Sequence, residues 1–248
     1  KIKVNFDQNE IINLFRDYNI NYTDIASNPF LVIATFSDEF DNIGLSKNNP
    51  FYNLDKKNLL NNNNNLLKLI FPDLSINDRY ILPYNRIIKN DLISLNQISQ
   101  KYDVNNLIIF KIKKIKNNFY EFNTSIFSME DNEVYKLENF EIDNILNIQE
   151  EFVHLVNDWW KNKNLINIDN VNTIVCYINS TNYDDLIKIK SKIMNLSQFK
   201  SSTIKTISMN QNIEIISYYG SFDMFSTNLR FKNLQIKNND SCSISSVN

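Results

Sequence analysis

The 248-residue chain is short of the residues on which many catalytic and nucleotide-binding motifs depend. Its glycines are Gly44 and Gly220, its one histidine is His154, and it has two cysteines. A phosphate-binding loop needs several closely spaced glycines, so the glycine-rich nucleotide-binding classes are excluded. A zinc centre needs three or four ligands, and one histidine with two distant cysteines predicts no metal site. The sequence predicts no cofactor.

Long apolar runs and an excess of positive charge are also missing. No stretch reaches the length of a membrane-spanning helix, and no signal peptide is recognisable, so the given residues predict no membrane span. The net charge of −2 argues against a nucleic-acid partner, because such proteins normally carry a basic face. The one basic run, residues 111–116, interleaves lysine with isoleucine. On a strand these lysines would protect an edge or cover a solvated face, and phosphate or lipid binding is the alternative.

Asparagine is abundant and glycine is scarce, a bias typical of an AT-rich genome. Average usage would give about 17 glycines in a chain of this length. Asparagine tolerates the left-handed backbone conformation better than other residues with a side chain, so we expect it at turns and helix C-caps. The hydrophobic fraction of 43%, with 12% aromatics, is enough to build packed cores.

The last third of the chain has the clearest periodicity. Runs that alternate like strands are separated by runs with apolar residues at helical spacing, and short polar residues stand at the helix starts. The predicted order is a strand at 173–178, a helix at 183–194, a hairpin of strands at 202–209 and 213–219, a helix after Ser221, and a strand at 242–247. This βαββαβ order predicts a ferredoxin-like module over residues 166–248, with two helices on one face of a four-stranded antiparallel sheet.

The two cysteines fall in the first and last strands of this module. Strands at those positions need not be neighbours, so two buried free thiols at Cys176 and Cys242 are predicted, and a disulfide is the alternative.

The region before this module predicts a second α/β domain over residues 1–165. It contains strands at 1–6 and 29–34, helices at 9–18, 92–102 and 145–163, and a hairpin at 107–129. A long connection at about 38–90, which includes an asparagine-rich helix, is predicted to be an insertion. A strand that opens at the first residue would close a module whose earlier part precedes Lys1.

The helix-to-strand junction at residues 98–109 resembles that of TolB N-terminal-like envelope domains, with Asp103 where those have glycine. Together with the strands at 3–7 and 28–32, the segment 69–74, the tryptophan pair 159–160 and the terminal module, it resembles bacterial family 2066 of the domains of unknown function. The resemblance implies an exported envelope protein, periplasmic or envelope-associated, of a Gram-negative bacterium. A signal peptide would precede Lys1. It implies no enzymatic activity.

Three functional hypotheses follow. The first is a non-enzymatic scaffold that binds other envelope proteins through sheet edges and grooves, with Trp160 as the candidate partner contact. The second is an enzyme or small-ligand binder whose pocket lies in the 38–90 insertion and faces residues 111–116. The third is a subunit of an oligomeric envelope assembly. The candidate pocket residues of the second hypothesis are Tyr52, Arg79, Tyr84 and Arg86.

Two other groups of ionisable residues are interpreted as structural. His154 is expected to be an ordinary helix residue in contact with Asp158 one turn later. The adjacent acidic pairs at 38–39, 130–131 and 184–185 lack the spacing of a calcium loop, and their positions favour turns and helix caps.

Overall fold

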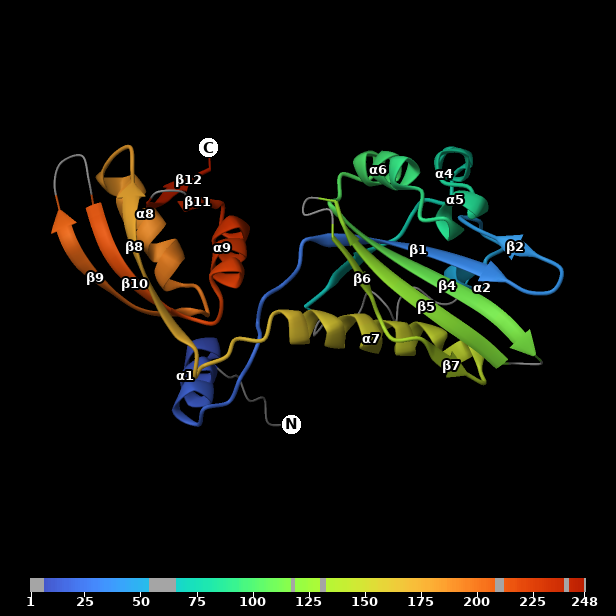
Figure 1. Ribbon diagram of the computed structural model, residues 1–248, viewed down its shortest axis with the longest axis horizontal. Coiled ribbons are helices and arrows are strands. Elements are labelled where there is room, and N and C mark those ends of the chain that lie inside the picture. The colour runs from blue at the N-terminus through green and yellow to red at the C-terminus, as the bar shows by residue number, and fades with distance from the viewer. Residues whose placement is uncertain are drawn as a thin grey trace, which may run out of the picture. The chain divides into compact units, whose positions relative to one another are not determined.

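The computed structural model describes residues 7–53, 66–116, 119–129, 133–207, 212–238 and 241–247, and the chain divides into two compact units (Figure 1). The central unit runs from residue 26 to residue 162. The terminal unit joins residues 7–25 to residues 163–247. The predicted boundary at 165 is close to the observed one, but the assignment of residues 7–25 to the first domain differs from the structure. The predicted strand at 1–6 lies outside the described residues.

Long-range hydrogen bonds explain why residues 7–25 belong to the terminal unit. Helix α1 (Gln8–Asp17) carries Arg16, whose Nη2 donates to the carbonyl oxygens of Ser197 at 2.7 Å and Phe199 at 3.1 Å. Tyr22 forms an isolated bridge with Ile166, whose N–H donates to the Tyr22 carbonyl at 2.8 Å. Local periodicity predicts the helix but carries no information on these distant partners.

The central unit is built on a mixed sheet. In the described residues it contains seven strands, in the order β2-β1-β4-β5-β6, with β3 added beside β1 and β7 beside β5. β1 is parallel to β3 and β4, and the remaining pairs are antiparallel. The strands are β1 (Pro29–Ser37), β2 (Asn42–Ile43), β3 (Lys68–Ile70), β4 (Asn106–Lys116), β5 (Phe119–Ser128), β6 (Glu133–Lys136) and β7 (Phe140–Ile142).

Helices cover both faces of this sheet (Figure 1). On one face lie α2 (Pro50–Asn53) and α7 (Ile148–Lys163), which follows the short 3-10 helix Ile145–Asn147. There the ring of Phe110 lies 5.4 Å from that of Phe51 and 4.7 Å from that of Phe152. On the other face lie α4 (Ile76–Ile81), α5 (Tyr84–Ile88) and α6 (Leu92–Lys101). A strand buried on both faces needs an unbroken apolar run, which β1 has from Phe30 to Phe36.

The 38–90 insertion supplies both strands that pair with the outer edge of β1. β2 pairs with its last two residues and β3 with its first three. The stretch between is closed by side chains: the Tyr52 hydroxyl accepts from the N–H of Ala34 at 2.7 Å, and Asn49 Nδ2 donates to the Ala34 carbonyl at 3.0 Å. The asparagine-rich helix predicted in this insertion falls mainly on residues 54–65, which are not described.

The terminal unit contains a mixed sheet in the order β11-β12-β8-β10-β9. The predicted βαββαβ order is present, but the sheet is neither four-stranded nor fully antiparallel: β11 is added, and β12 runs parallel to β8. The elements are β8 (Val171–Asn179), α8 (Tyr183–Met194), β9 (Phe199–Ile207), β10 (Asn212–Tyr219), α9 (Phe222–Phe231), β11 (Leu234–Asn238) and β12 (Cys242–Ser246). Because β11 turns back into β12, the last strand takes the position beside β8 in the opposite direction to the one predicted.

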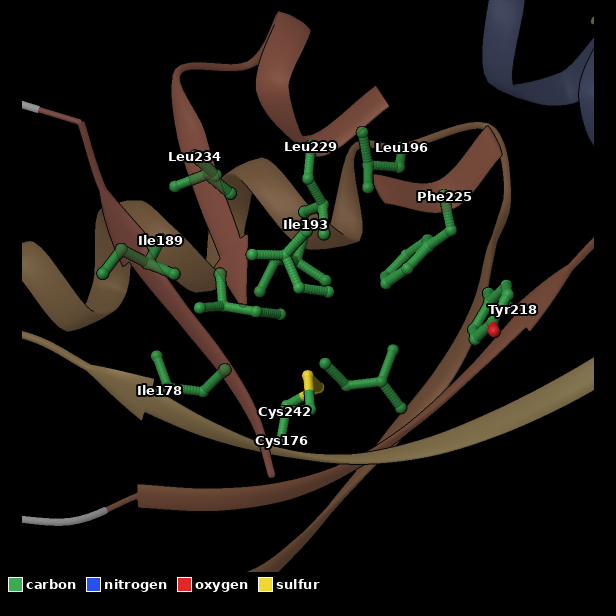
Figure 2. Packing of buried hydrophobic residues seen from close by; sticks show 13 residues of the cluster. Cys176, Ile178, Ile189, Ile193, Leu196, Tyr218, Phe225, Leu229, Leu234 and Cys242 are labelled. Atoms are coloured by element: carbon green, nitrogen blue, oxygen red, sulfur yellow. A yellow bond between two sulfur atoms is a disulfide. The ribbon is translucent and has the colours of Figure 1, made fainter. Parts of the chain in front are cut away.

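This pairing corrects the prediction of two free thiols. Cys242 is the register partner of Cys176, their Cα atoms are 4.5 Å apart, and the two residues form a disulfide. The bond lies in the hydrophobic core between the sheet and helices α8 and α9, in a cluster with Ile178, Ile193 and Phe225 (Figure 2). It closes a sequence separation of 66 residues. In the chain-entropy account this constrains the unfolded chain by about 4 kcal/mol.

Asparagine takes several of the backbone positions that glycine usually fills. Asn19, Asn90 and Asn233 have φ values of 53°, 52° and 55°, and each follows a helix. This confirms the expectation drawn from the composition. Within the described residues, none of the helices is both long and apolar enough to span a membrane.

Candidate functional site

The terminal sheet has one face covered by helices and one largely open. Side chains alternate along a strand, and Cys176, Ile178 and Ile216 point into the core under α8 and α9. The neighbouring positions therefore point to the opposite face. On β8 and β10 these outward residues pair across the strands as Thr173 with Ser217, Val175 with Ile215, and Tyr177 with Ile213.

This open face is apolar and uncharged at its centre. Val175 is 43% exposed, and Tyr177, Ile213 and Ile215 are half-buried. None of the outward positions of β8, β10 and β12, all of which the structure describes, carries a charged residue. Protein interfaces differ from ordinary surface mainly in the depletion of charge at their centre and the enrichment of aromatic residues. The face has that composition.

Helix α1 closes one end of the open face. The Arg16 guanidinium lies over the Tyr219 ring at 5.3 Å, and the Tyr22 hydroxyl donates to the Ser197 carbonyl at 2.8 Å. Burial raises the pKa of Tyr22, although the nearby Arg16 acts against that rise. These contacts fix α1 against the start of β9 and leave the rest of that strand uncovered.

β9 is one of the two edge strands of the terminal sheet, and β11 is the other. It pairs with β10 on one side and ends the strand order on the other. Lys200 and Lys205 are exposed, the strand contains no acidic residue, and Ile207 is 69% exposed. An edge strand presents unpaired backbone N–H and C=O groups, which can add a strand from another chain.

The helix-covered side of the sheet holds a buried ion pair with a structural role. Glu214 on β10 is buried, and its Oε1 lies 2.5 Å from Nζ of Lys190 on α8. Because the carboxylate is enclosed under the helix, it is a contact between layers and contributes nothing to the open face.

The central unit has an open groove where the insertion meets the basic end of β4. Its volume is about 600 Å³, and its lining residues are Asp38, Glu39, Phe40, Lys114, Ile115 and Lys116. Asp38 is committed to its own turn, since its Oδ1 accepts from the backbone N–H groups of Phe40 and Asp41. The backbone hydrogen bonds from Asp41 and Phe40 lower the Asp38 pKa. The groove therefore offers an exposed aromatic ring and two lysines, and one of its two carboxylates is held by backbone hydrogen bonds.

The four residues of the predicted pocket do not converge through hydrogen bonds in the described part of the chain. Tyr52 is buried, and its hydroxyl serves the edge of β1; burial raises its pKa. Arg86 Nη1 donates to Ser94 Oγ at 2.9 Å. Arg79 is exposed on α4, and Tyr84 is half-buried beside Gly44. Tyr52 and Arg86 thus have structural partners.

The candidate partner contact Trp160 lies in the core. It is 7% exposed, and its ring lies 5.9 Å from that of Phe30. The neighbouring Trp159 packs on the same ring at 6.2 Å. Phe152 and Val156 are buried on the side of α7 that faces the sheet. The indole rings of Trp159 and Trp160 lie on that side too, against Phe30. Trp160 is therefore not an exposed anchor.

His154 is an exposed helix residue, as expected, but its partner differs. Its Nε2 lies 3.9 Å from Glu150 Oε1, one turn earlier, whereas Asp158 pairs with Lys161 at 3.5 Å. In the described residues no group of three or more His, Cys, Asp and Glu side chains could hold a metal ion.

A buried carboxylate ties two helices of the central unit together. Asp78 is fully buried in α4, where it completes a capping box with Ser75, and it pairs with Lys101 of α6. Tyr102 also donates to Asp78 Oδ2, at 3.0 Å. Burial alone would raise the pKa of Asp78, but the hydrogen bonds from Lys101, Ser75 and Tyr102 outweigh it and hold the pKa below its usual value. This full set of partners gives Asp78 a structural role, which is to join α4 to α6.

The open face of the terminal sheet was not predicted, although the sequence contains a signal for it. From Ile174 to Ile178 the strand β8 is apolar at successive positions, which is typical of a strand buried on both faces. The helices of the predicted module cover only one face, so the other apolar set had to remain open. The two observations together would have located the site.

The fold and this site define a two-unit α/β protein. Helices cover both faces of its central sheet and one face of its terminal sheet. No protein-family model matches the chain, and no curated protein matches it. Among solved structures, the C-terminal domain of LpoB from Salmonella enterica is similar, at 12% sequence identity and a TM-score of 0.31, over 55% of this chain and 98% of that one. A TM-score this low establishes no shared fold.

Proposed function

We propose that this chain is a non-enzymatic protein of the bacterial envelope that binds other envelope proteins through the terminal sheet. The observation that carries the proposal is the uncharged face of β8 and β10, which adjoins the free edge of β9. A flat apolar face beside an unpaired edge can take a partner by strand addition and bury the side chains of that partner at the same time.

The lysines of β9 indicate the chemistry of the partner. Two copies of β9 paired antiparallel around its centre would bring Lys200 and Lys205 of the two chains close together, and like charges across a strand pair are destabilising. A partner strand with acidic residues would be attracted by the same lysines. The edge therefore favours an acidic, extended segment of a different protein, and it disfavours self-assembly through β9.

The disulfide supports an extracytoplasmic location. Disulfides form and persist in oxidising compartments such as the bacterial periplasm, and they are rare in the cytosol of mesophiles. The bond between Cys176 and Cys242 fits an exported protein. This agrees with what the resemblance to family 2066 implies.

Site-specific photo-crosslinking in the native envelope tests the proposal. A photoreactive residue replaces Thr203 on β9 in one version and exposed Lys188 on α8 in another. We expect a distinct protein to be captured from position 203 and not from position 188. Capture of the same proteins at both positions would contradict the proposal.

A matched pair of substitutions then separates the face from the fold. Val175→Asp places a charge at the centre of the open face, and Ile187→Asp does the same on the exposed side of α8. We expect the first to lower capture at position 203 at least about ten-fold, as a central interface residue does, and the second to leave it unchanged. Equal capture by both variants would show that the face is not the contact.

A further inference from the structure

The pairing of β9 with β10 is interrupted twice, and the extra residue is a lysine each time. The register skips Lys205 at one interruption and Lys200 at the other. Such an extra residue is a β-bulge, which disrupts the ladder and bends the strand. Between the two bulges the pairing is regular, from Ser201 to Ile204. A bulge in the middle of β9 would blunt the whole edge, whereas bulges at its ends leave four regular residues open to another strand.

The bulge lysine at the start of β9 shares an aromatic ring with a second cation. Nζ of Lys200 lies 5.6 Å from the centre of the Tyr219 ring, and the Arg16 guanidinium lies 5.3 Å from it. Asp24 accepts from the hydroxyl of Ser197, to whose carbonyl Arg16 donates, so this carboxylate lies on the Arg16 side. Lys200 itself has no ion pair within the described residues.

The bulge lysine near the other end of β9 is also without a carboxylate partner. Lys205 is exposed, and it forms no ion pair with any residue that the structure describes. The acid nearest to it in register, Glu214, is buried and paired with Lys190. The sequence from residue 196 to residue 213 contains no acidic residue. An acidic group that meets either lysine therefore has to come from outside β9 and its flanking turns.

Between the bulges, the two faces of β9 differ in polarity. Ile204 is the register partner of Glu214, so it points to the helix-covered side of the sheet. It is 47% exposed, because β9 ends the strand order and the next strand that would bury it is missing from the described part of this sheet. Thr203 pairs with Ile215 and points to the open face. An added strand would need an apolar side chain beside Ile204.

We infer, on the basis of the proposed function, that the partner segment is extended and has acidic residues flanking a core of four uncharged residues. The core pairs with Ser201–Ile204, and its side chains on the helix-covered side are apolar. The two acidic residues lie opposite Lys200 and Lys205, where the bulges end the pairing. The bulges oppose the addition of a longer strand, so the edge selects its partner by length as well as by charge.

A titration of the purified full chain with capped peptides, followed through its backbone amide signals by nuclear magnetic resonance, tests this inference. The probe peptide has glutamate at both ends of a four-residue core in which valine alternates with threonine. We expect the amide signals of Ser201–Ile204 to shift. Backbone N–H groups of a strand point alternately to its two edges, so methylating alternate core nitrogens blocks one edge. One of the two complementary methylated peptides should lose binding and the other should retain it.

Charge exchange tests the role of the lysines. Lys200→Glu with Lys205→Glu should weaken binding of the glutamate peptide about ten-fold and should bind a peptide with lysine at both ends, because two exposed ion pairs change from attraction to repulsion and back. Lys188→Glu with Lys232→Glu makes the same change in net charge at exposed positions elsewhere in the terminal unit. The affinity of this control variant for the glutamate peptide should not change.

The outcomes separate this inference from the proposed function. Signals of Ser201–Ile204 that do not shift at millimolar peptide would overturn the inference, as would binding by both methylated peptides or equal loss of affinity in the two charge variants. If a protein is still captured from position 203 in such a case, the proposed function stands with a partner of different chemistry. Peptide binding at β9 without any capture in the envelope would contradict the proposed function alone.

Discussion

The two sheets of this protein differ in how they treat their faces and edges. The central sheet is covered by helices on both faces, and at one of its edges β1 is closed by β2, β3 and the side chains of Asn49 and Tyr52, while β6 and β7 form its other edge. The terminal sheet is covered on one face and ends in the uncovered strand β9. Closing an edge removes the backbone groups that could pair with another chain. We therefore expect a binding surface in the terminal unit, on the sheet whose second face and β9 edge are uncovered.

The largest expected effect concerns the disulfide of the terminal unit. Within the described residues the central unit has no such bond. Cys176→Ser with Cys242→Ser should lower the unfolding free energy of the terminal unit by about 4 kcal/mol, because the unfolded chain regains the entropy of a 66-residue loop. Denaturant unfolding of the oxidised and substituted chains, followed by hydrogen exchange of each unit, measures this.

The central unit serves as the internal control in that experiment. Its core depends on apolar packing around Phe51, Phe110 and Phe152, so its exchange protection should not change. Equal destabilisation of both units would mean that they unfold as one cooperative body and that the disulfide does not act on the terminal unit alone.

The next effect belongs to the central unit and depends on pH. Asp78→Asn should cost about 3 kcal/mol at neutral pH, because it breaks a buried ion pair. The folded pKa of Asp78 lies below its unfolded value, which is about 3.9, so its contribution is fully present above that value. The contribution is lost as the pH falls through the folded pKa.

A pH series of denaturant unfolding checks the sign of this linkage. The gap in stability between the natural chain and Asp78→Asn should be constant above about pH 5 and should shrink as the pH falls below about 4. Lys190→Gln, which leaves the buried Glu214 unpaired in the terminal unit, is the matched comparison. A gap that widens towards acid would contradict the structural role assigned to Asp78.

Local order was predictable from the sequence, whereas long-range pairing was not. The α/β class and the βαββαβ order follow from the two periodicities, and the cap at Ser221 follows from its short polar side chain; its Oγ accepts from the N–H of Met224. The strand β11 has five residues and a weak pattern, so it was missed, and with it the direction of β12. The disulfide depends on that direction, which explains why the sequence predicts two free thiols at Cys176 and Cys242.

The candidate site shows the same limit. Trp160 and Tyr52 are large residues of types common in binding sites, but the structure places both in the core of the central unit. Whether an aromatic residue faces a core or a partner depends on which layer covers it, and that is a tertiary fact. The apolar run of β8 gave the better signal because it could be compared with the number of helices available to cover it.

The smallest expected effect is a difference in stability between two Tyr→Phe variants. One lies at the closed β1 edge of the central sheet and the other on the open face of the terminal sheet. Tyr52→Phe removes the hydroxyl that accepts from the buried N–H of Ala34, and an unsatisfied buried donor costs about 1.5 kcal/mol. Tyr177→Phe makes the same change on the open face, where water can replace any lost hydrogen bond, so its effect should be about zero. Thermal unfolding of the two variants measures the difference. If both variants are as stable as the natural chain, the Tyr52 hydroxyl does not stabilise this edge, and β2, β3 and Asn49 alone close it.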